Sequence, residues 1–313
     1  MNTPTAFETP VLFLIFNRPD HTRRSFEAIR ARRPTRLFIA ADGPRAHAPT
    51  DVARVAQCRE VVSAVDWPCE VRTLYREQNL GCGTAVSQAI TWFFGQVDRG
   101  IILEDDCVPG ADFWAFCATL LERYAGDPRV MCISGDNFLP AWVPIRGAYY
   151  FSRYPYIWGW ATWARAWDHY KLTPKCPSGA QVADTLSGVG IRNPLSRWWW
   201  KRTFARHLGP ASTSWGYRWT YAVWAAKGLS ATPHRNLVSN IGVDGDATHT
   251  TEPMHLPKAN ALDHARPLNS FHPPCRNRLA DAVYDLQTTI GRNLISHGLR
   301  KLWKGLPGVR RSP

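Results

Sequence analysis

The sequence contains no long apolar run, no closely spaced cysteine pair and no phosphate-binding loop of the Gly-Lys-Ser/Thr type. Its longest fully apolar segment near the start is Val11–Phe16, far below the ~20 residues that a membrane-spanning helix needs. Arg18 and Asp20 follow that run at once, so we expect no secretory signal. Because the eight cysteines include no C-x-x-C spacing, a zinc site built on cysteine pairs is excluded, and we expect reduced thiols in a cytoplasmic protein.

Acidic residues are scarce as well, with 25 against 38 basic residues and a net charge of +13. A positive balance favours an anionic partner, for which nucleic acid, an anionic lipid surface and a nucleoside diphosphate are all candidates. The tryptophans are not interleaved with Lys and Arg in a nucleic-acid-binding motif, so no nucleic-acid partner is expected. With 45% apolar residues, the 313-residue chain has ample material for one large domain or two small ones.

The first 135 residues alternate between short apolar runs and segments with helical signals. This rhythm predicts an α/β fold with a mostly parallel central sheet flanked by helices. Expected strands are 11–16, 37–41, 70–75, 101–103 and 130–134, and expected helices are 19–31, 52–65, 84–94 and 113–124.

Polar side chains follow these predicted strands, at the end where ligands bind in open parallel sheets. Asn17 and Arg18 follow the first strand and Asp42 the second. An arginine can stack on or hydrogen-bond a nucleoside base, and a carboxylate can accept from its N–H groups. The stretch from 76 to 83 follows the third strand, and there Arg76, Asn79 and Gly83 are candidates for holding a diphosphate.

The most informative segment is Glu104-Asp105-Asp106, here called the acidic triplet, which ends the fourth predicted strand. Three adjacent carboxylates repel one another unless a cation or hydrogen-bond donors offset them. Mg²⁺ or Mn²⁺ is commonly held by one or two carboxylates together with substrate phosphates. The triplet therefore predicts a divalent cation that stabilises a departing diphosphate, with an exposed acidic turn as the alternative.

The composition changes in the second half, where eleven of the 15 tryptophans fall between Trp142 and Trp224. We expect a nucleotide-binding half over 1–135 and a Trp-rich acceptor-side half over 136–250. A Pro-rich strap over 251–278 and a basic helix and tail over 279–313 complete the chain. The helix carries an apolar stripe, so it either packs on the domain or lies on an anionic membrane surface.

The sequence resembles the GT-A-fold glycosyltransferases, which use nucleotide-sugar donors and a D-x-D-type acidic motif. Within that group it is similar to the bacterial hemolysin HlpA-like, or family 2-like, glycosyltransferases and, more distantly, to the N-acetylglucosaminyltransferase I family. The segments that carry the resemblance cover most of residues 10–250, and they are PVLFLIFNRPDHTRRSFEAI, LFIAADGPR, REQNLGCGTAVSQAITWFF, GIILEDDCVPGADFWAFC, VMCISGDNF, YPYIWGWATWARAW and NLVSNIGVDGDATHT.

The resemblance implies a role for several positions. Arg18 and Asp42 would hold the nucleotide base, Asp106 would ligate the metal, and Glu104 and Asp105 would contact the donor sugar and ribose. His249 would complete the metal or diphosphate site. Trp158, Trp160 and Trp215 are candidates for stacking on a sugar, although most tryptophans of this region are expected in the core.

The sequence departs from the family at Gly216, which stands where a catalytic aspartate is expected. Without a carboxylate there, the general base of an inverting transfer must come from elsewhere, and Asp136, Asp244 and Asp246 are the candidates. The implied function is metal-dependent transfer of a sugar, from a UDP-sugar or similar donor, to a hydroxyl of a glycan or glycolipid. The alternative is a non-catalytic module that binds nucleotide sugars or glycans. We expect a cytoplasmic protein, with attachment to the inner face of the membrane through the C-terminal helix.

Overall fold

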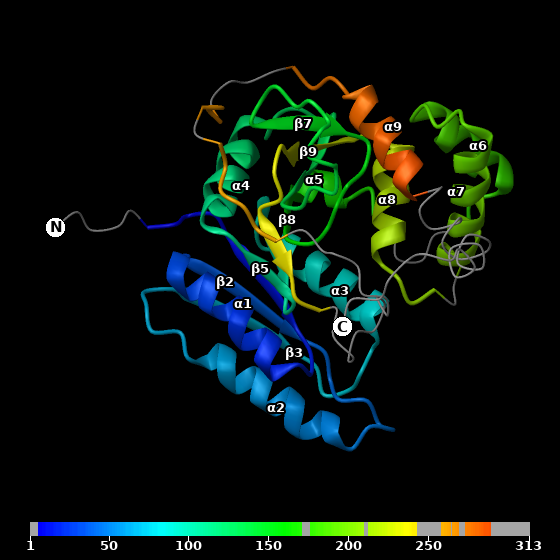
Figure 1. The fold of residues 1–313 in the computed structure, drawn as a ribbon. Coiled ribbons are helices and arrows are strands. Elements are labelled where there is room, and N and C mark those ends of the chain that lie inside the picture. The colour runs from blue at the N-terminus through cyan, green and yellow to red at the C-terminus, as the bar shows by residue number, and fades with distance from the viewer. Residues whose placement is uncertain are drawn as a thin grey trace, which may run out of the picture.

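The computed structural model describes residues 6–170, 176–209, 212–242, 258–263, 265–268 and 273–288. In the first part of the chain, helices and parallel strands alternate (Figure 1). The elements are β1 (Val11–Ile15), α1 (Pro19–Arg32), β2 (Arg36–Ala41), α2 (Thr50–Ser63), β3 (Glu70–Tyr75), α3 (Cys82–Phe94), β4 (Arg99–Glu104), β5 (Cys107–Pro109), α4 (Ala111–Arg123) and β6 (Val130–Ser134).

The second part is richer in helices and in short strands. Its elements are β7 (Tyr149–Ser152), β8 (Trp160–Trp163), α5 (Ala164–Trp167), α6 (Gly179–Gly188), α7 (Pro194–His207), α8 (Gly216–Ala225), β9 (Leu229–Pro233), β10 (Val238–Asn240) and α9 (Arg278–Leu286). No helix in the described ranges is long and apolar enough to cross a membrane.

The central sheet has eight strands in the order β3-β2-β1-β4-β8-β6-β9-β7. The four strands from β3 to β4 are parallel, as predicted. Beyond β4 the sheet is mixed, because β8 runs antiparallel to both β4 and β6, and β7 runs antiparallel to β9. The fold is therefore mixed α/β. Six of the eight strands run in one direction, as expected for a mostly parallel sheet, and β8 and β7 run in the other.

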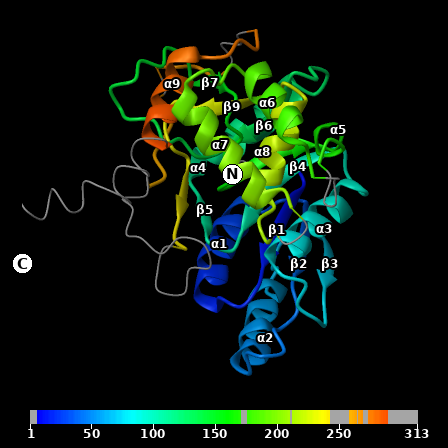
Figure 2. The ribbon, with the colours of Figure 1, turned by 90° about the vertical axis from the view of Figure 1, so that its right-hand side faces the viewer.

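Helices cover both faces of the sheet because the buried strands are apolar on both sides. On one face, the odd-numbered residues of β1 pack against α1, α2 and α4, with Phe26 and Phe113 among the contributors. On the other face, Leu12 and Leu14 pack against α3 and the aromatic helices α5 to α8. Figure 2 shows α6, α7 and α8 as the layer on the side facing the viewer.

The segment that follows residue 237 also forms a strand, β10, but outside the central sheet. As β10 it pairs antiparallel with β5, with Asn240 opposite Cys107 and Val238 opposite Pro109. Because β5 begins directly after the acidic triplet, this small second sheet brings the end of the second half of the chain against the end of β4. It therefore connects the two halves at one edge.

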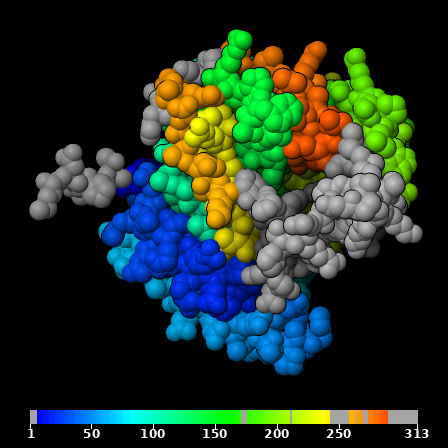
Figure 3. Space-filling model, in the orientation of Figure 1, coloured from blue at the N-terminus to red at the C-terminus, as the bar shows by residue number. Residues whose placement is uncertain are grey.

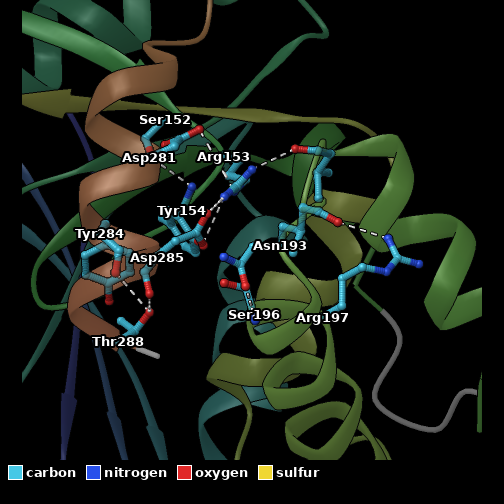
Figure 4. A network of polar contacts seen from close by, with 12 residues as sticks. Ser152, Arg153, Tyr154, Asn193, Ser196, Arg197, Asp281, Tyr284, Asp285 and Thr288 are labelled. Atoms are coloured by element: carbon cyan, nitrogen blue, oxygen red, sulfur yellow. Dashed lines mark hydrogen bonds and ion pairs between the residues drawn. The ribbon is translucent and has the colours of Figure 1, made fainter. Parts of the chain in front are cut away.

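Helix α9 packs on β7 and on the segment before it, and the helix and this segment lie side by side on the face shown in Figure 3. Ala280 there joins Val143, Ile145 and Tyr150 of β7 in a small apolar cluster. The inner side of α9 is polar. Asp281 accepts a hydrogen bond from Ser152 Oγ at 2.6 Å, and Asp285 accepts from Arg153 and from the Tyr154 hydroxyl (Figure 4). Together with Arg276, whose Nε lies 3.3 Å from Asp281 Oδ2, these residues form what we call the α9 cluster.

The predicted C-terminal helix begins as α9, and over residues 278–286 it packs on the domain. The helix buries Asp281 and leaves Leu279 and Leu286 exposed, so part of the predicted apolar stripe faces outward. Residues 289–313 lie outside the described residues.

All eight cysteines lie in described segments and are free. Four of them, Cys58, Cys107, Cys117 and Cys132, are buried in the core, whereas Cys176 and Cys275 are exposed. The expectation of reduced core thiols therefore holds for half of them.

Candidate functional site

The carboxyl ends of β1 and β4 bring Arg18 to the acidic triplet. In the parallel pairing of these strands, Leu14 lies opposite Glu104, so the residues that follow both strands meet at one edge. The Arg18 guanidinium donates to Asp105 Oδ1 and, at 2.9 Å, to Asp106 Oδ2. We call Arg18 and the acidic triplet the edge cluster. Sequence analysis predicted both parts, but not that they would pair with each other.

Three carboxylates and one guanidinium leave the edge cluster with excess negative charge. Burial and then the neighbouring carboxylates raise the pKa of Glu104 to about 8. Burial also raises the pKa of Asp105, to about 6, against the opposing effect of Arg18. Although burial lowers it, the pKa of Arg18 is raised overall by Asp105 and Asp106. The cluster thus favours an additional positive charge or hydrogen-bond donor.

Asp105 is the most buried member of the cluster, at 4% exposure. Its backbone carbonyl accepts from Ser25 Oγ at 2.8 Å, which fixes the turn between β4 and β5 against α1. Its Oδ2 atom is buried and has no hydrogen-bond partner among the described residues. A buried carboxylate oxygen without a partner costs stability, so this atom is a place where a ligand could be accommodated.

The residues after β10 close one side of the cluster. The Ile241 N–H donates to the Asp106 carbonyl at 2.8 Å, and His21 Nε2 donates to the Ile241 carbonyl at 3.0 Å. A side chain on Gly242 would overlap the Asp106 carboxylate, so only glycine fits there. The predicted residues Asp244, Asp246 and His249 follow in sequence but lie outside the described residues.

The Asp42 carboxylate is hydrogen-bonded to groups of the protein itself. It accepts hydrogen bonds from the backbone N–H groups of Gly43, Leu80 and Gly81 at 3.0–3.1 Å, and from Asn79 Nδ2 at 3.0 Å. A carboxylate offers about four acceptor positions, so these donors occupy its capacity. Asp42 and Asn79 therefore shape the loop before α3, whereas sequence analysis predicted that they contact the nucleotide.

Asn17 and Arg76 also have partners within the fold. Asn17 Nδ2 donates to Asp51 Oδ1 at 2.8 Å, and Arg45 binds the same carboxylate. Arg45 and then Asn17 hold the pKa of Asp51 below its usual range. Sequence analysis missed this arrangement, because nothing in the sequence pairs Asp51 with residues before α2. Arg76 donates to Gln88 Oε1 at 3.3 Å. Burial lowers the pKa of Arg76, against the opposing effect of Asp42.

Helix α3 begins beside the acidic residues. Burial, followed by the negative charges of the acidic triplet and Asp42, raises the pKa of the Cys82 thiol to about 12. These carboxylates are therefore gathered around the first residue of α3. Gly81 has a φ of 78°, in the region that favours glycine, and a side chain on Gly83 would lie 2.8 Å from the Thr213 carbonyl. The predicted glycines thus permit a close approach of the loop before α8.

The strand register brings Asp136 to the level of Glu104. Ile102 is paired with Trp160 of β8, and Trp160 is paired with Ser134 of β6. The paired ends of β4 and β6 are thus separated by one strand, or roughly 10 Å. Glu104 and Asp136 each follow this row by two residues, at the same end of the sheet. Trp158 lies in the intervening row, and its backbone N–H acts on Asp136.

Asp136 itself is 1% exposed, and its Oδ1 atom has no hydrogen-bond partner within the described ranges. Burial raises its pKa well above the usual value, against the opposing effect of backbone N–H groups, including its own. Its neighbour Asn137 is used structurally, since its side chain donates to the Pro233 carbonyl at 2.8 Å. A buried carboxyl with a raised pKa at a strand end has the properties of a proton-transferring group.

The tryptophans predicted to stack on a sugar are placed differently from one another. Trp160 and Trp215 are 1% and 4% exposed, and their rings stack on each other in the core with centroids 5.8 Å apart. Core packing leaves these two rings no free face, which corrects the prediction for them. Trp158 is only partly buried and packs its edge on Phe138.

Gly216 is the first residue of α8, and a side chain there would lie 2.7 Å from Ile157 Cδ1. The position that lacks the expected carboxylate is therefore next to the residue that precedes Trp158. It belongs to the same region of the molecule as Asp136, so a change at Gly216 can be compared directly with one at Asp136.

The residues of the edge cluster have the chemistry that a divalent cation needs, but they do not form a complete set of ligands. Carboxylate oxygens are the ligands that Mg²⁺ and Mn²⁺ prefer, and Asp105 Oδ2 is a buried oxygen without a partner among the described residues. Within the described residues, however, no group of three acidic, histidine or cysteine side chains is arranged to hold a metal ion. A cation here would depend on further oxygens, such as those of a phosphate.

A cavity of about 1050 Å³ lies at the opposite edge of the sheet, at the amino ends of β1, β2 and β4. Its lining includes Pro10, Arg36, Asp98 and Trp163. It is far along the strands from the acidic triplet, and the ion pair of Arg99 with Glu122 uses two of its charges. We therefore place the candidate site at the carboxyl edge.

Comparison with known proteins gives only distant likenesses. No protein-family model matches the chain, and no curated protein matches it. Among solved structures, HddC from Yersinia pseudotuberculosis is 12% identical with a TM-score of 0.26, over 38% of this chain and 55% of that one. Mannose-1-phosphate geranyltransferase from Thermus thermophilus is 14% identical with a TM-score of 0.32, over 72% of this chain and 73% of that one. These values are too low to support a functional argument, so the proposal below depends on the site itself.

Proposed function

We propose that the protein is a glycosyltransferase that moves a sugar from a nucleoside diphosphate donor to a hydroxyl of a glycan or glycolipid. The observation that carries the proposal is the edge cluster: an acidic triplet with Asp105 buried, paired with Arg18 where β1 and β4 end. Carboxyl ends of parallel strands are the usual binding sites of nucleotides in α/β folds. Transfer from a phosphate-linked donor needs cations close to the leaving diphosphate.

Donor binding would use the positive groups around the cluster. Arg18 is available to the diphosphate if a substrate or ion replaces it at one carboxylate, and Arg76 lies near Asp42 at the loop before α3. Asp42 acts indirectly in this proposal, because it holds the N–H groups of residues 80 and 81 in place. The fixed loop then positions the start of α3, whose backbone N–H groups would face phosphate oxygens.

The acidic triplet would hold Mg²⁺ or Mn²⁺, with Asp106 and Glu104 as the first candidates for ligands. When bound, such an ion supplies Lewis-acid stabilisation of the departing diphosphate. The raised pKa of Glu104 means that a cation also restores its ionised form. Arg18 would keep Asp105 oriented by the hydrogen bond that it retains, while the cation replaces it at Asp106.

Asp136 is our candidate for the general base. It would take the proton of the acceptor hydroxyl, whose oxygen attacks the anomeric carbon from the side opposite the diphosphate and inverts the centre. The separation of roughly 10 Å between the strands of Glu104 and Asp136 leaves room for a sugar ring between leaving group and base. Trp158, in the row between them, would offer its partly exposed ring to the sugar.

The test is a thermal-shift screen of nucleoside diphosphates, with and without Mn²⁺, on the wild type and on Asp106→Ala. A ligand at 100 times its dissociation constant stabilises a protein by about 2.7 kcal/mol, which gives a measurable rise in the unfolding temperature. We expect a response to UDP that requires Mn²⁺ and is lost in Asp106→Ala. A response that survives undiminished in the variant contradicts the role of Asp106.

The second candidate function is a module that binds nucleotide sugars or glycans without turning them over. It is motivated by Gly216, which offers no carboxylate at the position where the resembling family has one. Donor hydrolysis and transfer assays separate the two functions. Binding of UDP and Mn²⁺, without donor turnover on any acceptor, would favour the module.

A further inference from the structure

Helix α7 (Pro194–His207) presents two sides that differ sharply. Its inner side carries Ser196, Trp200 and Phe204, which repeat every four residues and are buried. Trp200 packs on Trp224 of α8 with ring centroids 4.5 Å apart. This side alone explains how α7 is held on the domain, so the composition of its other side needs a separate explanation.

At about 100° per residue, the outer side of α7 collects a set of apolar and basic residues. Leu195 and Trp198 are 47% and 50% exposed, although both are large and apolar. The guanidinium of Arg202 lies over the Trp198 ring, 5.1 Å from its centroid, so it belongs to the same surface. We call this surface the α7 outer face; its members are Leu195, Trp198, Trp199, Arg202 and Arg206.

The charge of this region has one sign. Residues 192–207 contain five arginines and lysines and no aspartate or glutamate. One of the five, Arg197, is used within the fold, where it donates to the carbonyls of Ile191 and Ala183. The other four, Arg192, Lys201, Arg202 and Arg206, are exposed. A partner of this surface must therefore be anionic and must also accept exposed apolar side chains.

We propose that the α7 outer face docks the protein on an anionic phospholipid surface. Tryptophan and leucine can enter the boundary between headgroups and acyl chains while neighbouring arginines contact the phosphates. Each basic residue near such a surface adds attraction. Figure 2 shows α7 in the outermost layer of the side that faces the viewer, where a flat surface can reach it.

The proposal is independent of the proposed glycosyl transfer, and it differs from the predicted attachment through the C-terminal helix. The described part of that helix, α9, turns Asp281 and Asp285 toward Arg153 and is fastened to the domain. Leu279 and Leu286 are nevertheless exposed on it. The test therefore includes α9 as a competing surface.

The experiment is flotation of the purified full chain with vesicles of phosphatidylcholine alone, or with roughly one third phosphatidylglycerol. We expect binding to the anionic vesicles only, with a loss of binding at high salt. Leu195→Ala with Trp198→Ala should weaken partitioning by about tenfold. Arg202→Gln with Arg206→Gln should weaken it by about fivefold for each charge removed.

Matched controls separate the α7 outer face from general charge and hydrophobicity. Trp142→Ala removes a tryptophan that is 70% exposed elsewhere, and Arg23→Gln with Arg24→Gln removes two exposed charges from α1. Both controls should bind as the wild type does. Hydrogen–deuterium exchange of the wild type on vesicles should protect residues 194–207, and it needs no variant.

Four results would overturn the proposal. They are equal affinity for neutral and anionic vesicles, wild-type binding by both α7 variants, loss of binding in Leu279→Ala with Leu286→Ala but not in the α7 variants, or retention on DNA or heparin without any vesicle binding. The third would assign the membrane surface to α9, and the fourth would assign the basic residues to a soluble polyanion.

Discussion

The edge cluster and the α9 cluster are built from the same kinds of residue but differ in charge balance. In the α9 cluster, two carboxylates face two arginines: Asp285 pairs with Arg153, and Asp281 Oδ2 lies 3.3 Å from Arg276 Nε. The hydroxyls of Ser152 and Tyr154 donate to Asp281 and Asp285 (Figure 4). In the edge cluster, three carboxylates share one arginine, Arg18. Buried atoms without a hydrogen-bond partner among the described residues occur in both clusters, at Asp105 Oδ2 and at Asp281 Oδ2 and Arg153 Nε, so the clusters differ in net charge and not in unpartnered atoms.

This difference indicates what each cluster is for. A balanced, hydrogen-bonded ion cluster can hold two elements together, here α9 and the strand β7 with its following residues. An unbalanced one costs stability, and such a cost is typical of a site whose missing charge arrives with a ligand. Changes to the first should therefore alter stability, and changes at the sheet edge should alter binding and chemistry.

The largest expected effect tests the chemical side of this comparison. Asp136→Asn removes the proposed base at the level of Glu104 and should lower the rate of sugar transfer by about 10³-fold. Its unfolding temperature should change by only a few degrees. The matched control is Asp281→Asn, in the α9 cluster, which should lower the unfolding temperature but leave the rate per folded molecule unchanged. A fully active Asp136→Asn enzyme would remove Asp136 from the mechanism.

Next in size is the stability of the balanced cluster. Arg153→Met leaves Asp281 and Asp285 with only part of their positive partner set and should lower the free energy of unfolding by about 3 kcal/mol. Urea denaturation measures this value. Arg129→Met breaks an exposed pair with Asp127 and should change the free energy of unfolding far less than Arg153→Met does. If Arg153→Met and Arg129→Met lower the free energy of unfolding by the same small amount, the α9 cluster does not hold α9 on the domain.

The pH dependence of stability should come from the unbalanced cluster. The pKa of Glu104 rises from 4.5 to about 8 on folding, so the folded protein binds more protons than the unfolded chain between these values. Stability is then highest below the unfolded pKa and falls as the pH rises toward 8, by about 2 kcal/mol over the two units from pH 6 to pH 8. Asp105 and Asp281, with pKa values raised to about 6, contribute only at the lower end.

Glu104→Gln isolates this contribution. Between pH 6 and 8, the wild type should lose more stability than the variant, because the raised pKa of Glu104 acts only in the wild type whereas that of Asp136 acts in both proteins. Denaturation curves across this range provide the measurement. A wild-type slope that persists unchanged in Glu104→Gln would show that Glu104 is not the group responsible.

In the first half of the fold, β1, β2 and β4 were predictable because they are buried on both faces and their sequences are apolar runs. The exposed edge strand β3 also agrees with the predicted strand 70–75. The polar residues after β1 and β4 meet as the parallel topology requires. The second half was not predictable, because the short strands β7, β8 and β9 are hidden among tryptophans that signal burial without a period.

In the site, sequence analysis found the residues but not their partners. Strand-end position was sufficient to select Arg18, the acidic triplet and Asp42. Backbone N–H groups of the loop before α3 occupy the acceptor positions of Asp42. Every residue except proline has such a group, so the sequence does not reveal this pairing. Similarly, the pairing of Arg45 with Asp51 depends on the conformation of the loop that precedes α2.

The smallest expected effect concerns the border between the two halves, at the first residue of α8. Gly216→Asp places a carboxylate at a helix N-terminus, which is worth about 0.5 kcal/mol, and displaces only the movable end of Ile157. If Asp136 is the base, the added carboxylate should leave the transfer rate within about twofold of the wild type. Steady-state kinetics of the wild type and Gly216→Asp provide the measurement. Gly126→Ala is the control, because a side chain at Gly126 would meet no other atom within 4 Å. A rise in rate confined to Gly216→Asp would move the base from the end of β6 to α8, and the chemical region would then extend across the sheet to the aromatic helices.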